Sequence, residues 1–192
     1  AIAVPTGKQD HIAAVYGGVS AIEFGLNDYV RTALHDDPAT ARHLEEMLIL
    51  TYTGDGRFSG MNNWEITKGY IDGCPVIREK LIEIRNVARE VARALVDGRL
   101  HDLPDLVNRE WSARRTLAPG VTTPRIDDMM DAARGSGALA GKICGAGGGG
   151  CMITLAPPQK RSAVEAALVA AGGHLMPFRV ELQGLTVSQD ES

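Results

Sequence analysis

The sequence predicts an α+β domain in which helices pack on an antiparallel sheet. Short apolar runs such as residues 47–52 (MLILTY) have the length and β-branched composition of buried strands. Longer segments, most clearly residues 75–95, repeat apolar residues at helical spacing. Strand-like and helix-like segments do not alternate regularly along the chain. The order therefore favours an α+β layer arrangement over a doubly wound parallel sheet.

The first elements in chain order are a short helix and a strand. Asp10 stands where a helix would begin, and an apolar stretch continues to Tyr16. The Gly17 and Gly18 pair interrupts the helix, and residues 19–24 then resemble a strand. We expect the polar stretch at 36–38 to be a loop.

The middle of the chain contains the buried strand and two helices. The strand at 47–52 ends in the turn-forming residues 53–56 (TGDG). The helix that opens at Pro75 has charged residues on its outer faces, and Gly98 is placed to end it. A second helix is expected over residues 103–116.

A third helix is predicted to begin at Thr123, because a threonine cap followed by proline is typical of a helix start. Residues 139–144 and 151–155 are short apolar segments joined by a glycine-rich turn, which predicts a hairpin.

The last elements are a helix and an edge strand. An alanine-rich helix is expected after Pro158, ending near Gly172. A final strand over 174–182 should lie on an edge, since Pro177 cannot donate a ladder hydrogen bond.

The composition excludes several functional classes. Of the 192 residues, 44% are hydrophobic and 23% are charged, and the net charge is −4 without a basic run. We therefore expect neither a nucleic-acid nor a membrane partner. The three cysteines lack zinc or disulfide spacing, so a cytoplasmic location without a metal site in the protein is expected. There is no signal peptide and no apolar stretch of transmembrane length.

The glycine-rich segment KICGAGGGGC is the most informative motif. Glycine in a regular element costs about 0.5–1 kcal/mol relative to alanine, so five glycines within six positions need a reason. Without Cβ atoms, successive amides can surround an anion such as a phosphate. A flexible linker is the alternative, but the flanking apolar runs favour a structured loop. The candidate residues are Lys142, Gly145, Ala146, Gly147, Gly148, Gly149 and Gly150.

Two motifs together resemble the GHMP kinase superfamily. KICGAGGGGCMITL is similar to the family's third conserved motif, a hairpin of the C-terminal domain that borders the active site. GKQDH, followed by a Tyr-Gly-Gly turn, resembles the segment that carries the catalytic aspartate, in the form typical of heptose-phosphate kinases. The resemblance implies a C-terminal domain with ferredoxin-like elements at 38–187. Residues 1–37 would be a remnant of the ATP-binding domain and 188–192 a frayed tail.

The resemblance also implies an activity, namely ATP- and Mg²⁺-dependent phosphorylation of a hydroxyl on a sugar or sugar phosphate. Asp10 would be the general base, although taken alone it is more typical of a helix cap. Lys8 would lie beside the substrate, and so would His11, which stands where the family usually has glutamine. His11 taken alone is more typical of a surface histidine. In the TGDGRFSG segment, Arg57 and Ser59 would bind the substrate, with a solvated turn as the alternative.

Two further groups remain open. Asn62, Asn63 and Trp64 have the polar and aromatic character of a sugar contact, or Trp64 is simply buried at a helix start. Arg114 and Arg115 are expected to lie on a solvated helix face.

One family feature does not occur in the sequence. The nucleotide-phosphate loop of the Pro-x-x-x-Gly-Leu-x-Ser-Ser type is not found, so we expect a missing N-terminal half, in the same product or a companion chain. The 192 residues alone are expected to be inactive. A non-catalytic metabolite-binding domain and a mevalonate-type kinase are the alternatives, and a homodimer is left open.

Overall fold

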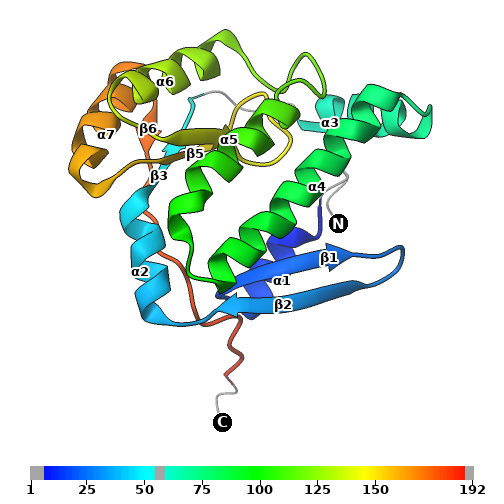
Figure 1. Ribbon diagram of the computed structural model, residues 1–192, viewed down its shortest axis with the longest axis horizontal. Coiled ribbons are helices and arrows are strands. Elements are labelled where there is room, and N and C mark those ends of the chain that lie inside the picture. The colour runs from blue at the N-terminus through cyan, green and yellow to red at the C-terminus, as the bar shows by residue number, and fades with distance from the viewer. Residues whose placement is uncertain (1–6, 55–58, 189–192) are drawn as a thin grey trace. The chain divides into compact units, whose positions relative to one another are not determined.

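The computed structural model describes residues 7–54 and 59–188 (Figure 1). The chain divides into two compact units. The smaller unit contains the first 45 residues together with those from 179 onward, and the larger unit contains residues 46–178. Both contain antiparallel strands and helices, which confirms the predicted α+β class.

The smaller unit is built from helix α1 (Gln9–Tyr16), strands β1 (Val19–Phe24) and β2 (Tyr29–His35), and most of helix α2 (Pro38–Met47). β1 and β2 form an antiparallel hairpin. The helix and the first strand match the prediction, whereas β2 and α2 were not predicted.

The loop expected at 36–38 is shorter than predicted, because Pro38 is already the first residue of α2. The Asp37 carboxylate accepts hydrogen bonds from the amides of Ala39 (3.1 Å) and Thr40 (2.8 Å). These bonds satisfy amides that have no partner within the helix and lower the pKa of Asp37.

The C-terminal segment packs along the first helix of the smaller unit. The Leu185 amide donates to the Val15 carbonyl (3.0 Å), and the Gly18 amide donates to the Glu181 carbonyl (2.7 Å). Gly17 has φ of 62°, a conformation that glycine adopts without strain. The Gly17 and Gly18 turn thus ends α1 and binds the C-terminal segment through the Gly18 amide.

The larger unit is organised around a four-stranded antiparallel sheet with the order β4-β5-β3-β6. Its strands are β3 (Leu48–Tyr52), β4 (Ala140–Ile143), β5 (Cys151–Leu155) and β6 (His174–Leu175). The hairpin of β4 and β5 and the edge position of β6 were predicted. The length of β6 was not, since the strand stops two residues before Pro177 instead of continuing to 182.

Five α-helices complete the larger unit: α3 (Ser59–Ile71), α4 (Pro75–Val96), α5 (Leu103–Arg114), α6 (Pro124–Gly135) and α7 (Arg161–Ala170). Two short 3-10 turns, Leu100–Asp102 and Pro158–Lys160, precede α5 and α7. All but α3 were predicted. At the start of α6 the Thr123 hydroxyl accepts from the Ile126 amide (3.3 Å), which confirms the predicted cap.

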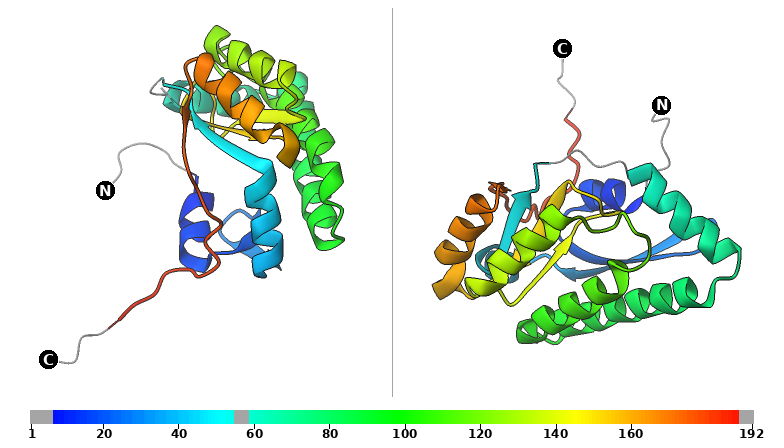
Figure 2. Two further views of the ribbon diagram at one scale, coloured as in Figure 1. Left: turned by 90° about the vertical axis from the view of Figure 1, so that its left-hand side faces the viewer. Right: turned by 90° about the horizontal axis from the view of Figure 1, so that it is seen from above.

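The main core lies between the sheet and helices α6 and α7, which pack against each other (Figure 2). Alternating strand residues face these helices, and their burial removes apolar surface from water. The core includes Ile49, Ile143 and Met152 of the sheet, Ile126 and Met129 of α6, and Val164 and Leu168 of α7. No helix in the described ranges is both long and apolar enough to cross a bilayer.

Candidate functional site

The glycine loop connects β4 to β5 at one end of the sheet and is held at both of its ends. The Cys144 amide donates to the Cys151 carbonyl (2.8 Å), and the Thr53 amide, just after β3, donates to the Gly150 carbonyl (2.9 Å). All five loop glycines have positive φ, from 73° at Gly145 to 135° at Gly149. Residues with a Cβ rarely adopt these angles, so the glycines are required by the backbone path.

One side of the loop packs on the turn before α6. The Gly148 amide donates to the Val121 carbonyl (2.9 Å). A Cβ added at Gly148 would lie 2.9 Å from the Gly120 carbonyl oxygen, which is closer than real Cβ contacts. The backbone of the loop therefore approaches a second backbone segment at a distance that only glycine allows.

A single buried side chain joins these two segments. Asn62 of α3 is 7% exposed, and its Nδ2 atom donates to the Gly120 carbonyl (2.8 Å) and to the Ala146 carbonyl (3.4 Å). The sequence indicates Asn62 only as a sugar contact, so its role as an anchor of the loop emerges from the structure. Its neighbour Trp64 is 64% exposed, which overturns the alternative of a buried tryptophan.

Lys142 points to helix α5. Its Nζ atom lies 2.8 Å from Glu110 Oε2, and the other oxygen of Glu110 is 2.5 Å from Arg114 Nε. Burial lowers the pKa of Lys142, partly offset by the attraction of Glu110. The cation predicted to assist the loop is thus paired with a buried carboxylate.

The contact with Glu110 corrects the expectation for Arg114, the last residue of α5. The Arg114 side chain is only 26% exposed and is bound to Glu110, so it does not belong to a solvated face. Arg115, which follows α5, is exposed as expected and pairs with Asp127 of α6 (3.1 Å).

The candidate catalytic segment lies in the smaller unit. Lys8 immediately precedes α1, and Asp10 and His11 occupy its first turn, with all three exposed. Their predicted roles stay predictions. Arg57 lies outside the described residues, and Ser59 is the first residue of α3.

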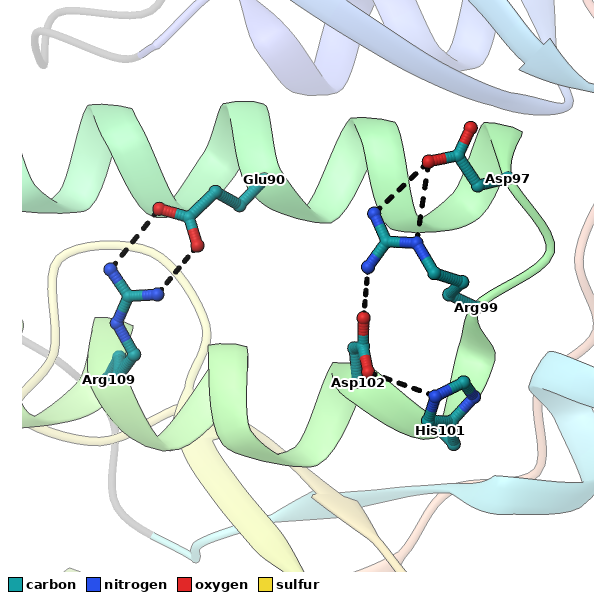
Figure 3. Close-up of polar contacts among 6 residues, drawn as sticks. All are labelled: Glu90, Asp97, Arg99, His101, Asp102 and Arg109. Carbon is teal, nitrogen blue, oxygen red and sulfur yellow. Dashed lines mark hydrogen bonds and ion pairs between the residues drawn. The ribbon is translucent and has the colours of Figure 1, made fainter.

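A second, charged region occupies the groove between α4 and α5 (Figure 3). Arg109 of α5 donates to Glu90 (2.6 Å) and Glu83 (2.9 Å) of α4, and these bonds raise its pKa. Arg99 pairs with Asp97 (3.1 Å) and with Asp102. Because carboxylates already pair these two guanidinium groups, the groove is a structural contact between helices rather than an anion site.

Comparisons with known proteins confirm the family resemblance. Residues 91–174 match the family described as GHMP kinases C terminal. The chain is 32% identical to a mevalonate kinase of Thermococcus onnurineus over 81% of its own length and 48% of that protein. It is 27% identical to a D-glycero-alpha-D-manno-heptose 7-phosphate kinase of Campylobacter jejuni, over 93% of its length and 52% of that protein.

A solved structure shows the same fold. The crystal structure of L. major mevalonate kinase in complex with R-mevalonate superposes with a TM-score of 0.74 at 19% identity, over 96% of this chain and 55% of that one. The chain thus spans about half the length of the curated relatives described above. The matched segment runs from the end of α4 to β6 and includes the glycine loop, so residues 91–174 belong to the GHMP kinase C-terminal family.

Proposed function

We propose that this chain is the C-terminal part of an ATP-dependent kinase that phosphorylates a hydroxyl group of a sugar or sugar phosphate. The observation that carries the proposal is the glycine loop, whose five glycines all adopt positive φ. Such a backbone can direct successive amides at one anion, as phosphate-binding loops do. The resemblance to a heptose-phosphate kinase supports this substrate class.

Two backbone amides of the loop are available to bind an anion. The Gly148 amide donates to the Val121 carbonyl, whereas the amides of Gly147 and Gly149 donate to no acceptor among the described residues. Phosphoryl transfer depends mainly on positioning and on stabilising the charge of the transferred group. The two amides would supply that stabilisation without adding a charged side chain.

Asp10 is the proposed general base. A carboxylate within hydrogen-bond reach of the substrate hydroxyl can accept its proton as the phosphoryl group arrives. Lys8 and His11 would contact the substrate from the same turn, and Arg57 and Ser59, which follow β3 in the chain, would also bind it.

ATP is the donor used by GHMP kinases, and Mg²⁺ would be carried by its phosphates. The described residues contain no group of three His, Cys, Asp or Glu side chains placed to hold a metal. We therefore assign the protein's own residues to orienting the hydroxyl and the phosphoryl group, and assign none of them as a metal ligand.

A mevalonate-type kinase is the second candidate, and the 32% identity to the Thermococcus onnurineus mevalonate kinase favours it. The two candidates share the donor, the loop chemistry and the role of Asp10. They differ in whether the acceptor is a sugar or a branched hydroxy acid.

A phosphorylation screen of the complete protein tests the proposal. It would compare heptose phosphates, hexoses, deoxyhexoses and mevalonate with ATP and Mg²⁺, following ADP release. Preferred turnover of a sugar or sugar phosphate supports the first candidate, and preferred turnover of mevalonate supports the second. Binding of one of these metabolites without turnover would instead indicate a non-catalytic domain.

The role of Asp10 is tested by Asp10→Asn in the complete protein. We expect at least about a hundredfold loss of turnover, because general-base catalysis typically contributes that much. Nucleotide binding, measured by calorimetry, should be unchanged. Near-normal turnover would remove Asp10 from the assigned role.

A further inference from the structure

Two cysteines face each other where the glycine loop leaves the sheet. The register of β4 and β5 pairs Ile143 with Met152, so the next pair toward the loop is Cys144 with Cys151. The hydrogen bond from the Cys144 amide to the Cys151 carbonyl (2.8 Å) continues the ladder through this pair. Residues directly opposite each other on antiparallel strands point to the same face of the sheet.

The spacing of such a pair suits a disulfide. Opposite residues in a hydrogen-bonded antiparallel pair have Cα atoms about 5.5 Å apart, and disulfides bridge Cα atoms that are about 4.4–6.8 Å apart. None of the three cysteines, all of which lie in the described part of the chain, is in a disulfide. The third, Cys74, precedes α4 and is not on the sheet.

The two thiols are on the face of the sheet opposite the main core. Ile143 and Met152, one residue further from the loop, are fully buried and face the core. Cys144 and Cys151 point the other way and are partly exposed, so a small oxidant can reach them. The Lys142 ammonium lies close enough to Cys144 to interact with it electrostatically.

We propose that Cys144 and Cys151 are a redox-active pair that closes to a disulfide across the neck of the glycine loop. The oxidant is a low-molecular-weight disulfide such as oxidised glutathione. One cysteine thiolate attacks it, releases one glutathione thiolate and forms a mixed disulfide. The second cysteine thiolate then attacks the protein sulfur and releases the second glutathione. Two protein thiols lose two electrons and two protons, and one glutathione disulfide becomes two thiols.

Closing this bond would restrict the loop. The chain connects residues 145–150 to the sheet through β4 and β5, and the two cysteines stand at the loop ends of these strands. A covalent bridge at this point removes the freedom of the strand ends to separate, in addition to the existing hydrogen bond. If the loop binds phosphate, as the proposed function states, oxidation should slow the reaction by hindering adjustment of the loop around the transferred group.

Mass spectrometry of the oxidised chain tests the bond itself, independently of any activity. Trypsin cleavage after Lys142 and Lys160 places both cysteines in one peptide, residues 143–160. After treatment with oxidised glutathione and blocking with N-ethylmaleimide, we expect this peptide to be unblocked and two hydrogen atoms lighter than its reduced form. A peptide that is blocked twice, or that carries glutathione on both cysteines, would overturn the proposal.

Single variants separate this pair from general thiol oxidation. In Cys144→Ser, Cys151 should retain glutathione, because no thiol stands opposite it on the neighbouring strand to release it. In Cys74→Ser, the matched control, the bridge should form as in the parent chain. Loss of the bridge in Cys74→Ser would contradict the pairing.

The effect on function is measured in the complete protein with its established substrate. Oxidation should lower turnover about tenfold and dithiothreitol should restore it, while the double variant Cys144→Ser, Cys151→Ser, which forms neither the bridge nor a glutathione adduct at the loop, should be insensitive to oxidation. A bridged enzyme with unchanged turnover would overturn the regulatory role. If the complete protein phosphorylates no substrate, the proposed function fails, whereas the mass of peptide 143–160 still decides the bridge.

Discussion

The glycine loop and the groove between α4 and α5 are stabilised in opposite ways. The loop is anchored by a few backbone hydrogen bonds and by Asn62, which is 7% exposed. The groove is lined by many charged side chains, but Arg109 and its partner Glu90 are 45% and 41% exposed. Exposed ion pairs contribute about 0–1 kcal/mol each, whereas a buried polar group that loses its partner costs about 1–3 kcal/mol. The contacts at the loop, although fewer, should therefore contribute more to the stability of the fold than the ion pairs of the groove.

The largest effect is expected from Gly148→Val. The valine would need a positive φ of 79° and would place its Cβ 2.9 Å from the Gly120 carbonyl oxygen. We expect a loss of about 3 kcal/mol in the free energy of unfolding, measured by urea denaturation.

Gly135→Ala is the matched control for that variant. Gly135 is the last residue of α6 and has open space where a Cβ would be. Its replacement should leave stability unchanged or slightly raise it. Similar losses in the two variants would show that the loop has no special requirement for glycine.

Asn62→Asp should have the next largest effect. Aspartate keeps the shape of the side chain but presents a carboxylate to the carbonyls of Gly120 and Ala146, which the amide now joins. We expect a loss of about 2 kcal/mol and faster hydrogen exchange at the Gly148 amide. The exposed neighbour Asn63 supplies the control Asn63→Asp, and equal changes in both would remove Asn62 as the anchor of the loop.

Glu110→Gln tests a charged group that is buried, unlike the exposed ion pairs of the groove between α4 and α5. Glu110 is 9% exposed and pairs with Lys142 and Arg114, so its neutralisation leaves two cations with a weaker acceptor. We expect a loss of about 1–2 kcal/mol that persists at high salt, because buried pairs are screened less than exposed ones. If high salt abolishes the loss in the free energy of unfolding, the ion pairs of Glu110 behave like exposed surface pairs.

Arg109→Met should have the smallest effect at neutral pH. Arg109 lowers the pKa of Glu90, so the pair stabilises the fold above the ordinary carboxyl range. That contribution is lost as pH falls through the lowered pKa of Glu90. The difference between parent and variant, measured by denaturation from pH 7 to pH 3, should therefore shrink toward zero in acid. A difference that grows in acid would contradict this assignment.

Most of the fold could be predicted because its signals are local. Helix α4 repeats apolar residues over 22 positions, and the β4–β5 hairpin is marked by its glycines. Strand β2 was missed because its residues are largely exposed and include Arg31, which breaks the apolar alternation. Helix α3 was missed because its apolar residues do not gather on one face.

The site was predictable only in part, for a similar reason. The glycine cluster itself indicates a loop of unusual backbone conformation. The residue that anchors the loop, Asn62, could not be predicted, because it is 58 residues from Gly120 and 84 from Ala146 along the chain. The position of Lys142 in the motif predicts a cation that helps the loop bind an anion. Its partner Glu110 lies in α5, and nothing in the motif indicates this pairing.

The hydrogen bond between Leu185 and Val15 has a consequence for biosynthesis. The smaller unit is discontinuous, since one of its pieces precedes the larger unit and the other follows it. On the ribosome, residues 46–178 can emerge and fold while α1 and the turn after it still lack the segment that packs against them. The larger unit should therefore mature first, and the smaller unit should be completed only after residue 185 has left the exit tunnel.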